Sequence, residues 1–257
     1  MYDRFIFHLA KKLRYGSQVV DVGANVGDTL AIMCSANTSL DFLCIDGEDR
    51  YFSYLKKNIA RIKMQEPKIK IASHLAIITD DHTKKMLKGH RGTASFVEET
   101  SDDIEFTSLD RLTTLNNFTE VAFIKIDTDG YDYKVLNSSK EVIQSQKPII
   151  LFELQIENNT QLTGYIESLK FLEGNGYEHF YVFDNYGQLI LKSENRVKII
   201  ELVEYIGMQD NKRGTRTIFY LDILASTKRD SGILISAIES YKSEKTFTRN
   251  FQRYYSN

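Results

Sequence analysis

The sequence of 257 residues lacks the charge imbalance and the cysteine clusters that mark several classes of protein. Its 33 lysines and arginines nearly balance 35 aspartates and glutamates, for a net charge of −2. A dedicated nucleic-acid binder is usually strongly basic, so we expect no nucleic-acid partner. The only two cysteines, Cys34 and Cys44, lack metal-ligand spacing. They predict buried free thiols in a reducing, cytoplasmic compartment.

The chain also has no apolar run that is long enough to cross a membrane, so no integral membrane segment is expected. No secretory signal peptide is predicted either, because charged residues interrupt the apolar ones throughout the N-terminal stretch. Residues 1–16 are instead predicted to form a basic amphipathic helix. We expect this helix to pack against the domain, and contact with a membrane surface is the alternative.

Internal repeats, low-complexity tracts and linkers rich in proline and glycine are absent as well, so residues 1–257 are predicted to form one domain. Strand-like and helix-like patterns alternate, which predicts an α/β fold with a mostly parallel sheet and helices on both faces. The predicted strands are 18–22, 41–46, 68–78, 121–127, 149–154, a hairpin of 180–183 with 188–191, and 217–224. The predicted helices between them are 27–36, 50–63, 131–145, 160–174 and 195–207.

Two stretches depart from this alternation. Residues 79–120 contain short β-like runs that turn-forming residues separate, and we interpret them as a β-rich insertion after the third strand. Such an insertion is expected on the carboxyl side of the sheet, where loops that cover a ligand usually lie. Residues 228–257 are predicted to form a peripheral polar helix and tail.

The most informative stretch runs from Val19 to Thr29, where a β-branched strand ends in an acid and a glycine-rich turn. Gly23 and Gly27 permit positive φ and close approach of a ligand, and the N–H groups of the following helix favour an electronegative ligand. The spacing is not G-x-G-x-x-G, which disfavours a nicotinamide-dependent dehydrogenase. Asp46 ends the second strand about 20 residues later, where doubly wound folds hold a ribose diol.

Four predicted strands end in carboxylates, at Asp21, Asp46, Asp127 and Glu153. Ligands of doubly wound sheets bind beyond the carboxyl ends of the strands, so we expect these acids to converge on one crevice. Structural alternatives exist for several of them: Asp46 can begin a turn and Asp21 can satisfy loop amides. Asp129 and Asp132 can together cap the helix that follows them. Lys125 is unexpected inside a strand, and it shares a strand face with Asp127.

Two motifs support a family resemblance. Asp21-Val-Gly-Ala-Asn-Val-Gly-Asp28, with an acid ending the next strand, resembles the S-adenosylmethionine site of class I methyltransferases. Phe123-Ile-Lys-Ile-Asp-Thr-Asp-Gly-Tyr-Asp-Tyr-Lys-Val-Leu136 resembles the K-x-D-x-E-G signature of FkbM-type methyltransferases, and residues 107–112 resemble the segment that precedes it there. The resemblance covers residues 17–155. Asp46-Gly47 stands where that family often has Glu-Pro, and Asp129 stands where it has Glu.

The resemblance implies a Rossmann-like class I methyltransferase fold with a seven-stranded sheet. It also implies S-adenosylmethionine as cofactor, with S-adenosylhomocysteine as product. Around the methionine part of the cofactor it places Asp21, Gly23, Ala24, Asn25 and Gly27. It assigns the ribose hydroxyls to Asp46 and the adenine to the segment His74, Leu75 and Ala76.

For the chemistry, Asp127 is the candidate base or acceptor-orienting group. Lys125 and Glu153 are neighbours that set its charge state or bind the acceptor, and a structural ion pair between these two is the alternative. His90 is the other candidate base, and Arg91 beside it could bind an anionic acceptor. Both also fit an ordinary surface loop.

The resemblance also implies an enzyme that methylates a hydroxyl, with a sugar of a surface polysaccharide or its precursor as acceptor. Methylation of another small metabolite on nitrogen or oxygen is one alternative, and a non-catalytic nucleoside-binding module is another. We expect a small-molecule or glycan acceptor, and the oligomeric state stays open, a homodimer included. No metal is predicted, although Asp127, Asp129 and Glu153 could together bind Mg²⁺.

Overall fold

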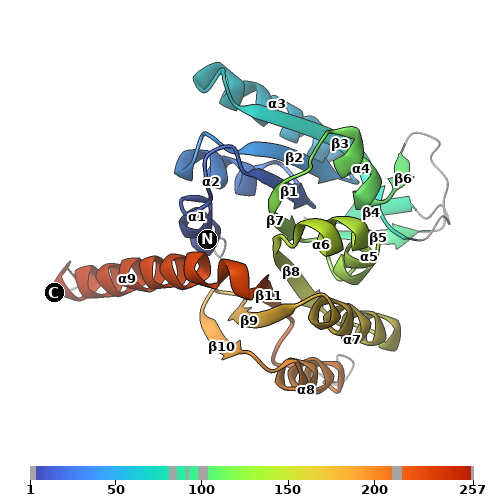
Figure 1. Cartoon of the computed structure of the whole chain (residues 1–257), viewed down its shortest axis with the longest axis vertical. Coiled ribbons are helices and arrows are strands. Elements are labelled where there is room, and N and C mark those ends of the chain that lie inside the picture. The colour runs from blue at the N-terminus through green and yellow to red at the C-terminus, as the bar shows by residue number, and fades with distance from the viewer. Residues whose placement is uncertain (1–3, 81–85, 91–92, 98–103, 210–215, 256–257) are drawn as a thin grey trace.

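A computed structural model describes residues 4–80, 86–90, 93–97, 104–209 and 216–255 (Figure 1). For residues 86–90, 93–97 and 245–255 it describes the backbone alone. Strands and helices alternate over most of this part of the chain, as the sequence predicts. No helix within these ranges is both long enough and apolar enough to cross a membrane.

Nine strands of the described chain form one sheet: β1 (Gln18–Val22), β2 (Asp41–Asp46), β3 (Lys70–Ile78), β6 (Glu105–Thr107), β7 (Val121–Ile126), β8 (Ile149–Gln155), β9 (Tyr177–Asp184), β10 (Leu189–Ser193) and β11 (Tyr220–Thr227). Their order is β10-β9-β11-β8-β7-β1-β2-β3-β6. The six strands from β8 to β6 run parallel. β11 lies antiparallel between β8 and β9, and β10 pairs antiparallel with β9, which confirms the predicted hairpin.

Two layers of helices cover the sheet (Figure 1). One face carries α1 (Arg4–Ala10), α2 (Asp28–Ala36), α3 (Asp49–Gln65) and α9 (Ser231–Tyr255). The other carries α4 (Leu109–Leu115), α5 (Asp132–Asn137), α6 (Lys140–Gln146), α7 (Asn159–Gly174) and α8 (Arg196–Gly207). The α/β architecture with helices on both faces is therefore as predicted.

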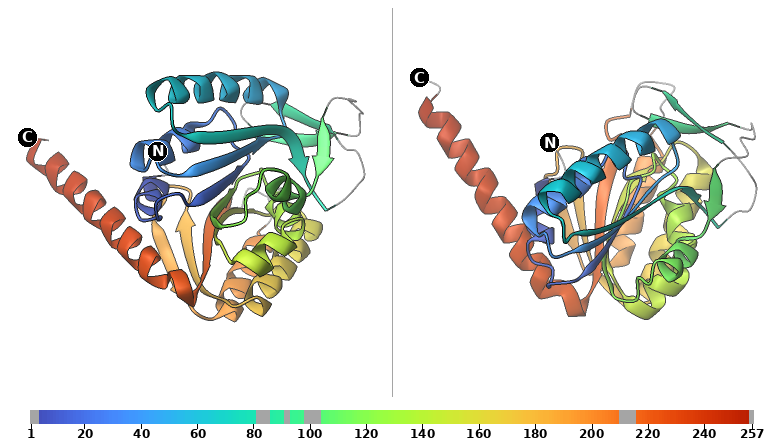
Figure 2. Two further views of the ribbon diagram at one scale, coloured as in Figure 1. Left: turned by 45° about the horizontal axis from the view of Figure 1, so that its top comes forward. Right: turned by 90° about the horizontal axis from the view of Figure 1, so that it is seen from above.

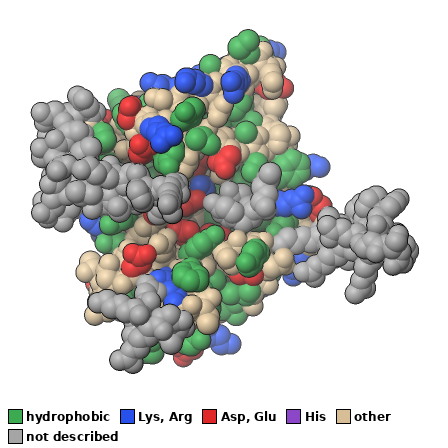
Figure 3. Space-filling model, turned by 180° about the vertical axis from the view of Figure 1, so that it is seen from behind, with side chains coloured by type: hydrophobic (Ala, Val, Ile, Leu, Met, Phe, Trp, Pro, Cys, Tyr) green, Lys and Arg blue, Asp and Glu red, His purple; other side chains and the backbone are tan. Residues whose placement is uncertain are grey.

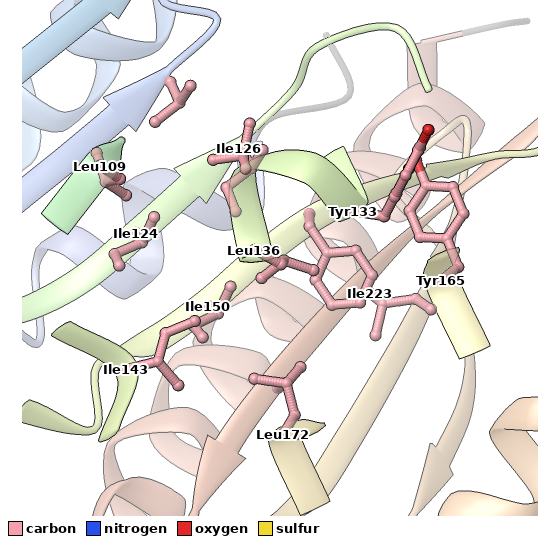
Figure 4. Packing of buried hydrophobic residues seen from close by; sticks show 14 of the residues in the cluster. Leu109, Ile124, Ile126, Tyr133, Leu136, Ile143, Ile150, Tyr165, Leu172 and Ile223 are labelled. Atoms are coloured by element: carbon pink, nitrogen blue, oxygen red, sulfur yellow. The ribbon is translucent and has the colours of Figure 1, made fainter. Parts of the chain in front are cut away.

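Alternation of side chains along each strand divides the core into two halves. Ile124 and Ile126 of β7 pack in the cluster formed with α4 to α8, whereas Phe123 packs in the cluster on the other face. Figure 4 shows Ile124 and Ile150 of the sheet against Ile143 of α6. Lys125 falls on the Phe123 face, so it does not project among the aliphatic side chains of the first cluster.

The number of strands differs from the prediction of seven. β6 extends the edge beside β3, with Ala76 to Ile78 as its partners, and β10 extends the opposite edge beside β9. The stretch 79–120 also divides into two kinds of structure. β4 (Met86–His90) and β5 (Thr93–Val97) form a separate antiparallel hairpin, while β6 and α4 join the main sheet and its helix layer. Ser108 caps α4 by accepting a hydrogen bond from Arg111 N at 3.1 Å.

The N-terminal helix packs on the domain, as expected, although it is shorter than predicted. Phe5, Ile6 and Leu9 of α1 are buried between the sheet, α2 and α9. The imidazole of His8 joins α1 to α9, with Nδ1 2.8 Å from Ser240 Oγ and Nε2 2.6 Å from Glu244 Oε2.

The C-terminal helix begins where the sequence predicts, but its first turns are not peripheral. Leu234, Ala237 and Tyr241 are buried in the same core cluster as α1. An apolar stripe within a polar sequence explains the difference, because a few side chains at helical spacing are sufficient to dock a helix. Figure 2 shows the remainder of α9 extending away from the body of the domain.

Candidate functional site

Two adjoining cavities open beyond the carboxyl ends of the parallel strands. The first is lined by the ends of β1, β2 and β3 and by the loop after β7, and the second by that same loop, β8 and the start of β11. Gly23, Asn25, Asp127 and Asp129 line both cavities. In Figure 3, acidic side chains gather near the middle of the face shown, with a basic side chain between them.

The turn between β1 and α2 brings two loops into contact. Gly23 has a φ of +76°, and a Cβ atom there would overlap the carbonyl oxygen of Asp127. Gly27 has a φ of +86°, and its Cβ would meet Leu55 Cδ1 at 2.8 Å. Gly23 is therefore required both by its conformation and by the approach of the loop after β7, whereas Gly27 serves the packing of α2 on α3.

Of the five residues predicted around the methionine part of the cofactor, only Gly23 and Asn25 line a cavity. Asp21 is fully buried beneath the turn, Ala24 is buried in the core, and Gly27 packs against α3. The resemblance located the turn, but it did not distinguish residues that face a ligand from residues that hold the turn in place.

Asp46 lines the first cavity and also organises the turns around it. One carboxylate oxygen accepts from Asn25 N at 2.7 Å and the other from Glu48 N at 2.9 Å. Burial raises the pKa of the Asp46 carboxyl, and the two backbone donors partly oppose this rise. The turn-forming alternative for Asp46 is thus present in the structure, and each of its oxygens keeps a further lone pair for a ligand.

The segment predicted to lie against adenine contributes one of its three residues to the first cavity. Ala76 lines the first cavity together with Ile77 and Ile78, whereas His74 and Leu75 line neither cavity. His74 Nε2 lies 3.0 Å from Asn116 Nδ2 at the end of α4. The cavity contacts the last three residues of β3, because only the end of the strand reaches the crevice.

Tyr51 also lines the first cavity, and the sequence reasoning did not identify it. It lies in the first turn of α3, where Glu48 caps the helix by accepting from Tyr51 N at 2.9 Å. An aromatic residue just after the strand-ending acid and a helix cap is the signal that could have located it.

Lys125 is buried between two carboxylates. Its Nζ lies 3.1 Å from Asp127 Oδ2 and 3.6 Å from Asp21 Oδ1. Strand register explains the second contact, because Lys125 of β7 is the direct partner of Asp21 of β1. The alternative of an ion pair between Lys125 and Glu153 is not what the structure shows, since Leu151 and not Glu153 is the partner of Lys125 on β8.

Asp132 lies at the centre of a second group of acidic residues. Its carboxylate accepts from Glu153 N at 2.9 Å, Thr128 N at 3.1 Å and Thr128 Oγ1 at 2.8 Å. Burial, followed by the nearby Asp127 carboxylate, raises the pKa of Asp132 to about 7. The alternative in which Asp129 and Asp132 together cap the helix is not what the structure shows, because the N-cap of α5 is Tyr131, without a side-chain cap hydrogen bond. Asp129 lines both cavities with a φ of +51°.

Glu153 lines the second cavity from β8 and is 9% exposed. Its Oε2 has no hydrogen-bond partner among the described residues. Burial raises the pKa of the Glu153 carboxyl well above its usual range, and the carboxylates of Asp127, Asp132 and Asp222 raise it further. Both effects favour the protonated form of the Glu153 carboxyl group.

Some predicted site residues lie outside what the structure describes. His90 belongs to β4, of which only the backbone is described, and Arg91 falls outside the described residues. In the described ranges, no three His, Cys, Asp or Glu side chains are arranged to hold a metal ion, and this applies to Asp127, Asp129 and Glu153 as well.

With this geometry in place, the comparison of the sequence with known families is informative. Residues 21–179 match the sequence model of the methyltransferase FkbM domain. The chain belongs to this family. As a member of the FkbM family it is a methyltransferase that uses S-adenosylmethionine, and the matched region contains the turn after β1, both acid groups and the loop after β7.

Solved structures with a similar chain path are methyltransferases of diverse kinds. Precorrin-6y C5,15-methyltransferase from Geobacter metallireducens is 10% identical, with a TM-score of 0.42 over 88% of this chain and 87% of that one. An S-adenosylmethionine-dependent O-methyltransferase from Thermotoga maritima is 9% identical, with a TM-score of 0.46 over 88% and 64%. The plantazolicin methyltransferase BamL, in complex with S-adenosylhomocysteine, is 11% identical, with a TM-score of 0.46 over 88% and 83%.

These identities and scores are low, so the family assignment is based on the sequence match alone. No curated protein sequence matches the chain. The first cavity nevertheless fits a nucleoside by its chemistry, because it combines the apolar ends of β3, the aromatic Tyr51 and the carboxylate of Asp46.

Proposed function

We propose that this FkbM-family protein transfers a methyl group to a hydroxyl of a small-molecule or glycan acceptor, and that this acceptor is a sugar of a polysaccharide or of its precursor. In this proposal the first cavity holds the nucleoside part of S-adenosylmethionine and the second cavity holds the acceptor. The two cavities meet at Gly23 and Asp127, where the methyl group would be transferred.

Different residues around the first cavity would contact different parts of the cofactor. Asp46 is placed to accept hydrogen bonds from ribose hydroxyls, and Tyr51 and Ala76 offer apolar surface to the base. Asn25 and Gly23 present the turn that borders the methionine part. Asp21, buried beneath that turn, holds it through Lys125 instead of contacting a ligand.

S-adenosylmethionine supplies a methyl group that its positively charged sulfur already activates, so the protein's main task is to align the acceptor oxygen with it. A hydroxyl must also lose its proton during the reaction. A partly exposed carboxylate at the junction of the two cavities can accept that proton.

One observation carries the proposal: Asp127 lies at the junction, keeps 26% of its side chain exposed, and is ion-paired to Lys125 at 3.1 Å. The ammonium group holds the carboxylate of Asp127 in place at the junction, where a carboxylate can accept a proton. Lys125 is itself buried at the base of the second cavity, where it orients this carboxylate.

The decisive experiment incubates the protein with labelled S-adenosylmethionine and a panel of sugars, amines and small phenols, and detects methylated products by mass spectrometry. We expect an increase of one methyl group on a sugar hydroxyl. Transfer to nitrogen would favour the alternative of amine methylation, and cofactor binding without transfer to any acceptor would favour a non-catalytic module.

The matching variant is Asp127→Asn, which preserves shape but removes the basic carboxylate. Turnover should fall by about 10²–10⁴-fold, the usual contribution of general-base catalysis, while affinity for S-adenosylhomocysteine changes little. Asp41→Asn is the control, because Asp41 lies at the opposite end of β2 in a surface ion pair with Lys70. Wild-type turnover in Asp127→Asn would overturn the assignment, and His90 would be tested next.

A further inference from the structure

The second cavity is rich in carboxyl groups. Those of its described lining are at Asp28, Asp127, Asp129, Glu153 and Glu157, and the two cationic groups are at Lys125 and Arg216. An acceptor that enters this cavity therefore meets an excess of acidic groups, and an anionic acceptor would be placed among like charges.

Both cationic groups are engaged by the protein itself. Lys125 is held between Asp21 and Asp127 at 3.6 and 3.1 Å. Arg216 donates from Nε to the carbonyl oxygen of Ile218 at 2.9 Å and from Nη2 to the carbonyl oxygen of Phe219, so its guanidinium group braces the chain that leads into β11. Both cationic groups therefore already have partners within the protein, and the lining has more carboxyl groups than cationic ones.

Glu153 provides the observation that points to a ligand. It is buried at the wall of the cavity, and its Oε2 has no partner in the described part of the chain. Four acidic groups lie near it: Asp127 and Asp129 after β7, Asp132 on α5, and Asp222, its direct partner on β11; the phenol of Tyr165 on α7 is a further titratable neighbour. Burial and these carboxylates raise the pKa of Glu153 and so favour its protonated form, in which the carboxyl group has an O–H that can donate a hydrogen bond.

The lining of the cavity also includes aromatic side chains. Phe219 and Tyr220 both contribute to it, and Phe219 is 62% exposed, so its ring is accessible to a ligand. An exposed ring beside hydrogen-bonding groups matches the two characters of a sugar ring, which has an apolar face and a hydroxylated rim.

We propose that the second cavity binds a polyhydroxyl acceptor without anionic groups, and that Glu153 is its specificity-determining residue, donating a hydrogen bond to an acceptor oxygen. This inference rests on the proposed function and deepens it. It predicts that the second cavity binds neutral glycosides in preference to sugar phosphates, uronic acids and nucleotide sugars, which carry negative charge close to the ring.

Two substitutions of Glu153 test whether its side chain acts as a neutral hydrogen-bond donor. Glu153→Gln retains a neutral side chain of the same shape with N–H donors, so the acceptor kcat/KM should stay within about threefold of wild type. Glu153→Leu removes the donor, and we expect the acceptor KM to rise about tenfold or more while kcat at saturation changes little. Leu154→Met is the matched control, because Leu154 is the next residue of β8 and packs into the core on the opposite face.

Two outcomes would overturn this role of Glu153. One is a loss of activity in Glu153→Gln as large as in Glu153→Leu, which would mean that an ionised carboxylate is needed. The other is an unchanged acceptor KM in Glu153→Leu, which would mean that the side chain does not touch the acceptor.

A binding experiment tests charge discrimination without requiring turnover. Methyl hexosides, the matching uronic acids and the matching hexose phosphates are titrated into the protein saturated with S-adenosylhomocysteine. We expect each neutral glycoside to bind at least tenfold more tightly than its anionic counterpart. Glu157→Gln removes an exposed carboxylate from the lining of the cavity. It should reduce this difference in affinity between neutral and anionic ligands severalfold.

The two proposals fail in different ways. Equal or tighter binding of the anionic ligands, or no binding of any neutral glycoside, overturns the inference on charge. Tight binding of neutral glycosides without methyl transfer supports this inference but contradicts the proposed O-methylation.

Discussion

Lys125→Met should destabilise the fold far more than the loss of an exposed lysine does. Only 6% of the Lys125 side chain and 1% of the Asp21 side chain are exposed. Removing the ammonium group leaves Asp21 as a buried carboxylate without its counter-charge, which typically costs about 3–5 kcal/mol of unfolding free energy. Solvent screening reduces this figure little, because both side chains are almost fully buried.

The same substitution at the surface provides the control. Lys70 pairs with Asp41 at 3.1 Å, but its side chain is 78% exposed, so Lys70→Met should cost between about 0 and 1 kcal/mol. The double variant Asp21→Asn with Lys125→Met should recover much of the lost stability, because the uncompensated charge is then absent.

Urea unfolding followed by far-UV circular dichroism measures these differences, since the chain has no tryptophan to report by fluorescence. The reasoning would be refuted if Lys125→Met lost no more unfolding free energy than Lys70→Met. A double variant that is less stable than Lys125→Met alone would also refute it.

Three further predictions concern the cofactor, pH and metal. Asp46→Ala should weaken S-adenosylhomocysteine binding tenfold or more in calorimetry, because each charge-assisted hydrogen bond contributes about 1.5–3 kcal/mol; unchanged affinity would remove the ribose assignment. The folded-state pKa of Asp132 is raised from 3.8 to about 7, so its stabilising contribution is fully present below about pH 4 and is lost as the pH rises through 7. Asp132→Asn should abolish that part of the pH dependence of unfolding, and an unchanged slope would contradict the assignment. Methyl transfer should persist in EDTA, and a loss of activity that Mg²⁺ restores would show a metal requirement.

The order of strands and helices followed from the sequence because hydrophobic periodicity is a local property. The edges of the sheet were harder to predict. β6 has only three residues, and neighbouring turn-forming residues masked it, although Ser108 at the start of α4 is a recognisable helix cap. Short edge strands are specified by the partner that they join, here the end of β3, and not by their own pattern.

The candidate site was predictable in its residue types but not in its pairings. The sequence located Lys125, Asp127 and Glu153 at the ends of adjacent strands, but the register between strands depends on the crossover helices. That register places Asp21 opposite Lys125 and leaves Glu153 facing Asp222. Asp21, Lys125 and Asp127 therefore form an ion-paired group, and Glu153 is a separate buried carboxyl group, a division that no spacing rule predicts.

The two cavities are coupled through a single structural unit. Asp21 and Lys125 are direct partners on β1 and β7, and two residues further along each strand come Gly23 and Asp127. The carbonyl group of Asp127 fills the space that a side chain at position 23 would occupy, so the two loops cannot move independently. The buried ion pair beneath them thus fixes both the turn that borders the cofactor and the carboxylate that faces the acceptor. A residue that contacts neither ligand can therefore control both sites, and we expect changes at Lys125 to affect cofactor affinity and turnover together.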